Sequence, residues 1–103
     1  MYRQGDVLIV PVKSLPKNLD PVDREQGRVV LAHGEVTGHA HAIKDRNAAL
    51  FRDPKLAAIF MHVSDDPVAL EHEEHATITI PPGNYRVIRQ REYSPEAIRN
   101  VAD

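Results

Sequence analysis

The chain has 103 residues, of which 42% are hydrophobic and 27% charged, a composition typical of one folded domain spanning 1–103. Its formal net charge of −2 excludes a globally basic nucleic-acid-binding protein, and the absence of cysteine excludes disulfides and thiolate metal ligands. No segment approaches the roughly 18 apolar residues of a membrane span, and the first residues lack a secretion signal, so we expect a cytoplasmic protein without membrane contact.

Apolar, β-branched runs bounded by turn residues predict a protein made mostly of strands. In chain order, the predicted strands cover 6–10, 28–32, 40–43, 47–51, 56–63, 68–73, 76–80 and 85–93, with a polar loop at 14–26. Periodicity does not separate helix from strand in 47–51 and 56–63, but the turn residues around them favour strands. Pro11 favours a sheet edge or a strand end at that point.

The end of the chain predicts two further features. Pro81 to Asn84 is a turn sequence, so the strands on either side of it are expected to form a hairpin. Ser94, Pro95 and Glu96 have the types of an N-cap and a first helical turn, which predicts a short C-terminal helix. Short strands at this spacing indicate a small single-domain β-barrel or β-sandwich.

Two histidines, His39 and His41, stand one residue apart directly after Gly38. On an extended backbone, residues two apart project from the same face, so the two imidazoles lie close enough to share one ion. Glycines at 34 and 38 allow the chain to turn tightly before the pair. The pattern is typical of a two-histidine half of a metal site.

The segment 71–75, Glu-His-Glu-Glu-His, places two imidazoles and three carboxylates after an apolar strand. On an ideal strand, His72 shares a face with the apolar residues before it, whereas His75 points the other way. A bulge or turn at Glu73 and Glu74 would bring His75 to the side of His72. Without that bend, His72 pairs with Glu74, and on a helical turn it pairs with His75.

We therefore predict a divalent-metal site made of His39, His41, His72 and His75. Nitrogen and oxygen donors without sulfur suit Zn, Fe, Mn, Ni or Cu better than Ca or Mg. Glu35, Glu73 or Glu74 would then serve as a catalytic base or orient an imidazole, and an open coordination position would let the protein act as a metalloenzyme on a small molecule. The plainer alternative is a set of structural or solvated histidines, which is what we expect of His33 and His62.

The strand 85–93 supports a different function, a non-enzymatic binding or assembly module that contacts a protein or a nucleic acid. Tyr85, Arg89, Arg91 and Tyr93 would share one face of that strand, a basic and aromatic arrangement used to bind single-stranded nucleic acid. A solvated strand whose arginine stems cover apolar surface explains the same pattern. Uncovered strand edges also make a homo-oligomer an open alternative.

Several blocks of the sequence carry a resemblance to known families: GEVTGHAH at 34–41, LEHEEH at 70–75, PGNYRV at 82–87 and QREY at 90–93. They resemble a group of small uncharacterised bacterial and phage-associated proteins, which supports treating these blocks as the site but implies no activity. The chain is also loosely similar to the cupins, whose first motif matches His39 and His41. That similarity implies a small metal-binding β-barrel.

Overall fold

The computed structural model describes residues 1–34 and 36–90. This part of the chain forms ten strands: β1 (Tyr2–Gln4), β2 (Val7–Val12), β3 (Asp20–Pro21), β4 (Val29–His33), β5 (Ala40–Ile43), β6 (Ala48–Arg52), β7 (Ile59–Val63), β8 (Val68–Glu71), β9 (Ile78–Ile80) and β10 (Gly83–Arg89). The described residues include no helix, and therefore none long and apolar enough to cross a membrane. The predicted C-terminal helix lies outside the described residues.

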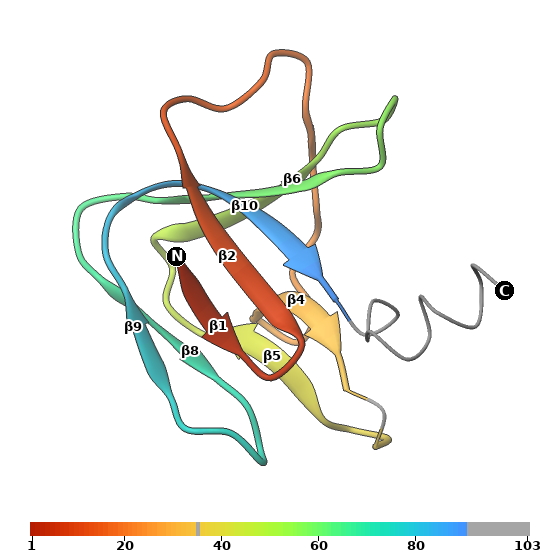
Figure 1. Cartoon of the computed structure of the whole chain (residues 1–103), viewed down its shortest axis with the longest axis vertical. Helices are drawn as coiled ribbons and strands as arrows, with labels where there is room; N and C mark the ends of the chain where they lie inside the picture. Colours follow the sequence, from red (N-terminus) through yellow and green to blue (C-terminus); the bar gives the residue numbers. More distant parts are fainter. Residues whose placement is uncertain (35, 91–103) are drawn as a thin grey trace, which may run out of the picture.

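The strands form two antiparallel sheets (Figure 1). The larger sheet has the order β1-β2-β10-β7-β6-β3, and the smaller has the order β4-β5-β8-β9. The described strands thus confirm the mostly β prediction in its two-sheet form, and they do not close into a barrel. The strands predicted at 47–51 and 56–63 correspond to β6, which extends one residue further, and to β7, as the flanking turns indicated.

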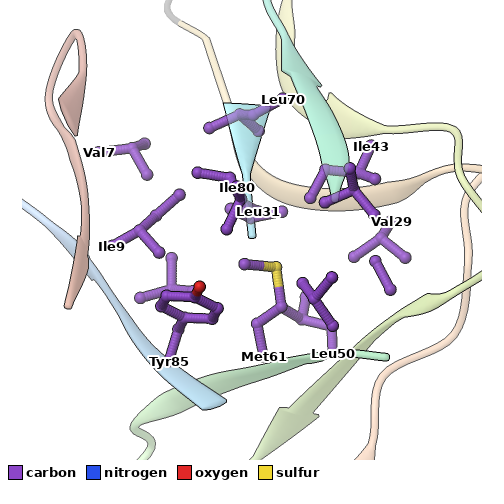
Figure 2. Close-up of a cluster of buried hydrophobic side chains, with 14 residues drawn as sticks. Val7, Ile9, Val29, Leu31, Ile43, Leu50, Met61, Leu70, Ile80 and Tyr85 are labelled. Atoms are coloured by element: carbon purple, nitrogen blue, oxygen red, sulfur yellow. The ribbon is translucent and has the colours of Figure 1, made fainter. Parts of the chain in front are cut away.

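One hydrophobic core lies between the two sheets (Figure 2). Alternate residues of several strands point into it, as Val7 and Ile9 do from β2, and Leu70 from β8 faces them from the smaller sheet. All three side chains are fully buried, and each contributes roughly 1.5–3 kcal/mol through removal of its apolar surface from water. This packing fixes one sheet over the other, so the loops at each end of the sandwich are held in place.

Pro11 lies within β2, at an edge of the larger sheet. The neighbouring strand β1 pairs with β2 only as far as Ile9, so beyond that residue β2 has a partner on one side only, where Pro11 lies opposite Tyr85. Proline has no N–H to donate, and at a sheet edge there is no neighbouring strand on that side to accept a hydrogen bond. The edge position expected from the sequence is confirmed.

The predicted hairpin around Pro81 to Asn84 is wrong. The strand before it, β9, pairs with β8 in the smaller sheet, whereas β10 pairs with β2 and β7 in the larger one. Pro81 and Pro82 have no N–H with which to extend a ladder, so the chain leaves one sheet and crosses to the other here. Tyr85 holds the crossing in place, because its hydroxyl donates a hydrogen bond to the Pro81 carbonyl oxygen at 2.6 Å.

Candidate functional site

Three connections meet at one end of the sandwich, the lower end in Figure 1. They are the β1–β2 turn, the described part of the β4–β5 connection, and the β8–β9 connection. In the β4–β5 connection, the Gly34 N–H donates to the His39 carbonyl oxygen at 2.8 Å, and this bond joins the two ends of the connection. The Gln4 amide Nε2 joins the two sheets, because it donates to the carbonyl oxygens of Leu70 and Ala76 at 2.9 and 3.0 Å.

The four predicted histidines come together at this end. The ring centroids of His41 and His72 are 4.3 Å apart, those of His72 and His75 4.7 Å, and those of His41 and His75 5.9 Å. The His39 ring lies edge-on to His72 at 5.9 Å. Because β8 ends at Glu71 and the chain then bends through residues 73–75, both histidines of that segment reach the same side. The bend required by the prediction is present.

His41 is the buried member of this histidine cluster, with 2% of its surface exposed. It occupies β5 two residues before Ile43, on the core-facing side, where the end of the sandwich covers it. Burial, followed by the charges of His72, His75 and Arg89, lowers the pKa of His41 to about 4, although the Asp6 carboxylate acts in the opposite direction. The imidazole of His41 is therefore neutral at pH 7 and has one lone pair.

The Gln4 side chain determines which His41 nitrogen carries that lone pair. Gln4 uses its NH₂ group on two backbone carbonyls, so its oxygen Oε1 faces His41 Nδ1 at 2.8 Å. An amide oxygen only accepts, and Nδ1 must therefore carry the proton. The lone pair lies on Nε2, which is 3.5 Å from Asp6 Oδ1.

The nitrogens of His72 and His39 are in different states. His72 Nδ1 accepts a hydrogen bond from the backbone N–H of Glu74 at 3.0 Å, so in its neutral form the proton of His72 lies on Nε2. His39 Nδ1 is buried without a hydrogen-bond partner among the described residues, and Glu74 Oε2 lies 3.5 Å from it. An orphaned buried nitrogen is uncommon, because leaving it unpaired costs about 1–3 kcal/mol.

The acidic residues predicted as catalytic candidates differ in position. Glu73 accepts a hydrogen bond from the Ala40 N–H at 2.9 Å, and this bond lowers the pKa of its carboxyl. Glu73 therefore ties the β8–β9 connection to the start of β5. Glu74 lies beside His39 and lines a pocket that opens onto the histidine cluster. Glu35 lies outside the described residues.

Two glycines give the imidazole rings their room. Gly5 has a φ of +58°, and a Cβ placed on it would come within 2.7 Å of His75 Nε2. A Cβ on Gly34 would come within 3.0 Å of the His39 Cβ and 3.3 Å of His72 Nε2. The contact of Gly5 with a ring 70 residues away has no local signal in the sequence.

A pocket of about 420 Å³ opens onto the histidine cluster. It is lined by Gly5, Asp6, Gly34, Val36, His41, His72, Glu74, His75 and Arg89. Arg89 Nε donates to Asp6 Oδ2 at 3.0 Å, and this ion pair lowers the pKa of Asp6 although burial alone would raise it. Sequence reasoning missed Gln4 and Asp6 as members of the site and assigned Arg89 to a different surface.

The other two histidines and Tyr85 lie outside the histidine cluster. His33 pairs with Glu25 at 3.1 Å and His62 with Asn84 at 2.7 Å, both on the exposed surface, so neither joins the cluster. Tyr85 is 3% exposed and belongs to the core, which means that it is not part of a nucleic-acid-binding face. Arg91 and Tyr93 lie outside the described residues.

The orientation of the rings is that of a packed cluster. Within residues 1–34 and 36–90, no three or more His, Asp or Glu side chains already stand in a geometry that could hold a metal ion. The His72 ring lies tilted or edge-on to the other three, the His41 and His75 rings are stacked, and His72 turns one nitrogen toward the backbone. Any shared ion therefore requires ring rotation.

Fold and site together define a small two-sheet β protein with a histidine pocket at one end. The chain belongs to the family described as "Domain of unknown function (DUF8820)", whose model matches residues 3–90 and so includes the whole histidine cluster. This membership agrees with the expected uncharacterised family, and it adds no cupin relationship and no phage association. Searches of curated proteins and of solved structures found no significant match.

Proposed function

We propose that this protein binds a divalent transition metal through His41 together with His39, His72 and His75. The observation that carries the proposal is the spacing of the rings. In a tetrahedral site with metal–nitrogen bonds of about 2.1 Å, the centroids of two ligating imidazoles lie about 5 Å apart. The four centroid separations at this end of the sandwich, 4.3 to 5.9 Å, lie on both sides of that value.

His41 supplies the fixed ligand of this proposed site. It is neutral, its Nδ1–H is held by Gln4, and its Nε2 lone pair faces the polar side of the pocket beside Asp6. A histidine that ligates a metal almost always donates its other ring N–H to a neighbouring acceptor, which fixes the tautomer and the ring plane. Gln4 and His41 have that relationship before any ion binds.

His72 and His39 complete the site after small movements. To offer a lone pair to the ion, the His72 ring gives up its hydrogen bond from Glu74, at a cost of about 1 kcal/mol. The orphaned His39 Nδ1 gains a partner if it ligates. Structural zinc sites in small peptides supply about 10–16 kcal/mol of apparent binding free energy, so the metal easily outweighs these costs.

The donor set selects the class of ion and the chemistry. Imidazoles with carboxylates nearby suit Zn, Fe, Mn, Ni or Cu. Three protein ligands with an open fourth position would give a catalytic site, and four would complete a tetrahedral one. The pocket beside the rings has room for a small molecule, so we propose that the four-histidine ion accepts such a molecule as a fifth ligand.

Equilibrium titration of purified, metal-stripped protein with Zn²⁺ and Ni²⁺ tests this function. We expect one ion per chain. Loss of a residue that only orients a ligand costs about 10- to 100-fold in affinity, so His41→Ala should weaken binding by at least about 100-fold. His75→Ala gives the same test at an exposed position, where truncation leaves the core intact.

The matched control is His62→Ala, an exposed histidine on the larger sheet outside the cluster. It removes one imidazole from the chain without touching the pocket, so affinity should stay within twofold of wild type. If metal affinity falls equally in all three variants, the metal binds to histidines scattered over the surface and not to the cluster, which contradicts the proposal. A wild-type protein that binds no stoichiometric metal would also refute it.

A further inference from the structure

Arg89 brings a positive charge to the same pocket. It is the last residue of β10, lines the pocket with His41 and His75, and its side chain is 26% exposed. Its only side-chain hydrogen bond among the described residues is from Nε to Asp6 Oδ2 at 3.0 Å. The two terminal amino groups of the guanidinium donate to no residue within 1–34 and 36–90, while the bond at Nε holds the group in place.

The ion pair with Asp6 does not by itself explain why an arginine stands here. The turn that carries Asp6 is already tied to the end of β10 by a backbone bond, since the Gln90 N–H donates to the Asp6 carbonyl oxygen at 2.8 Å. Asp6 Oδ1 also lies 3.5 Å from His41 Nε2. The guanidinium therefore adds charge and directed donors to a turn that the backbone already positions.

Metal binding would reverse the charge of the pocket. Apart from its histidines, the pocket is lined by one cation, Arg89, and two carboxylates, Asp6 and Glu74. A divalent ion changes the sign from net negative to net positive. An anion is then attracted, and a bound metal ion is often the largest local charge in such a site.

Building on the proposed metal function, we propose that the loaded pocket binds a small oxyanion-bearing molecule, a carboxylate or a phosphate, and that Arg89 is the residue that holds its anionic oxygens. The planar guanidinium matches the geometry of carboxylate and phosphate groups, and charge-assisted bonds of this kind are about twice as strong as neutral ones. The pocket volume of about 420 Å³ is within the usual range for small-molecule sites. Arg89 is a binding residue in this proposal, and the metal ligands are unchanged.

The test uses full-length protein loaded with Co²⁺, whose visible absorption reports changes at the ion. Succinate and inorganic phosphate are titrated separately into wild type, Arg89→Gln, Arg89→Lys and Arg86→Gln. Arg86 lies on the same strand but outside this pocket, so its variant is the matched control. Co²⁺ stoichiometry and thermal unfolding of each variant are measured first, and Arg89→Lys keeps the positive charge if the glutamine variant folds poorly.

We expect at least one of the two anions to bind to the wild type and to bind about tenfold or more weakly to Arg89→Gln, with Co²⁺ stoichiometry unchanged. Arg89→Lys should fall between the two, and Arg86→Gln should match wild type. The anion whose binding weakens in Arg89→Gln, succinate or phosphate, identifies the ligand class as a carboxylate or a phosphate. Co²⁺-loaded wild type that binds neither anion, or that binds one equally well without Arg89, overturns this inference alone; wild type that binds no Co²⁺ overturns the proposed function and this inference with it.

Discussion

Gln4 Oε1 lies 2.8 Å from His41 Nδ1 and accepts a hydrogen bond from it, across 37 residues of sequence and between the two sheets. The same Gln4 side chain donates to the carbonyl oxygen of Leu70 in β8 and to that of Ala76 in the β8–β9 connection. Both residues are 2% exposed, so water does not replace these bonds. Gln4 thus holds the two sheets together and fixes the His41 lone pair on Nε2.

Replacement of Gln4 by leucine keeps the volume and removes every one of these bonds. The His41 N–H and the carbonyl oxygens of Leu70 and Ala76 lose their partner, and we expect the free energy of unfolding to fall by about 2–4 kcal/mol. Zn²⁺ affinity should fall by about 10- to 100-fold, because the imidazole is no longer oriented. Urea unfolding and calorimetric titration measure the two effects.

The control for this change is Gln90→Leu. Gln90 accepts an exposed hydrogen bond from Arg3 with its side chain, so its loss should change stability by less than about 0.5 kcal/mol. If Gln4→Leu destabilises the fold but binds Zn²⁺ as tightly as wild type, Gln4 has no role in orienting the ligand.

Comparison of Gly5→Ala with Gly27→Ala separates the effect of backbone strain from that of crowding against the His75 ring. The added Cβ would lie 2.7 Å from His75 Nε2, so the ring must move, and the φ of +58° is itself strained for alanine. Gly27→Ala is the matched control, because Gly27 has a φ of +77° and nothing within 4 Å of the added Cβ. We expect both variants to lose about 1 kcal/mol of stability and only Gly5→Ala to lose Zn²⁺ affinity. Equal metal affinity in the two variants would place His75 outside the metal site.

Acid should destabilise the metal-free protein through His41. Its pKa in the folded state is about 4, below the ordinary value of 6.5, so the unfolded chain binds a proton in this interval and the folded chain does not. The free energy of unfolding therefore falls as pH drops from 6.5 toward 4, by up to about 1.4 kcal/mol per pH unit, and His41 contributes no pH dependence above that interval. Urea unfolding between pH 7.5 and 4 measures the slope. His41→Asn should flatten it and His62→Ala should not; an unchanged slope in His41→Asn contradicts the assignment.

Local patterns in the sequence predicted the strands and the pairing of the histidines. The one-residue spacing of His39 and His41 placed both beside the His72 ring, since period-2 alternation needs only an extended backbone. The sequence predicts that His75 reaches the side of His72 only if the chain bends between them, and the two rings lie 4.7 Å apart. The spacing of His72 and His75 in the sequence predicted neither the angle between their rings nor the hydrogen bond from the Glu74 N–H to His72.

Contacts between sheets had no local signal. Gln4 and Asp6 join the site only because β1 and β2 lie in the sheet that faces β5 and β8, and that topology depends on where the chain crosses at Pro81. The hairpin expected there was inferred from turn residues, which indicate a change of direction but not which strand follows as a partner. For the same reason Arg89 was assigned to a surface strand, although it reaches the pocket.

The measurement that tests the metal site most directly is a crystal structure of the Zn²⁺-soaked protein with anomalous scattering recorded on both sides of the zinc edge. We predict one strong peak per chain among the four rings, about 2.0–2.1 Å from His41 Nε2, with the His72 ring turned away from the Glu74 amide. A peak only at exposed sites such as His33 and Glu25, or no peak while His72 keeps its hydrogen bond to Glu74, would contradict the account and leave the cluster as a packed structural feature.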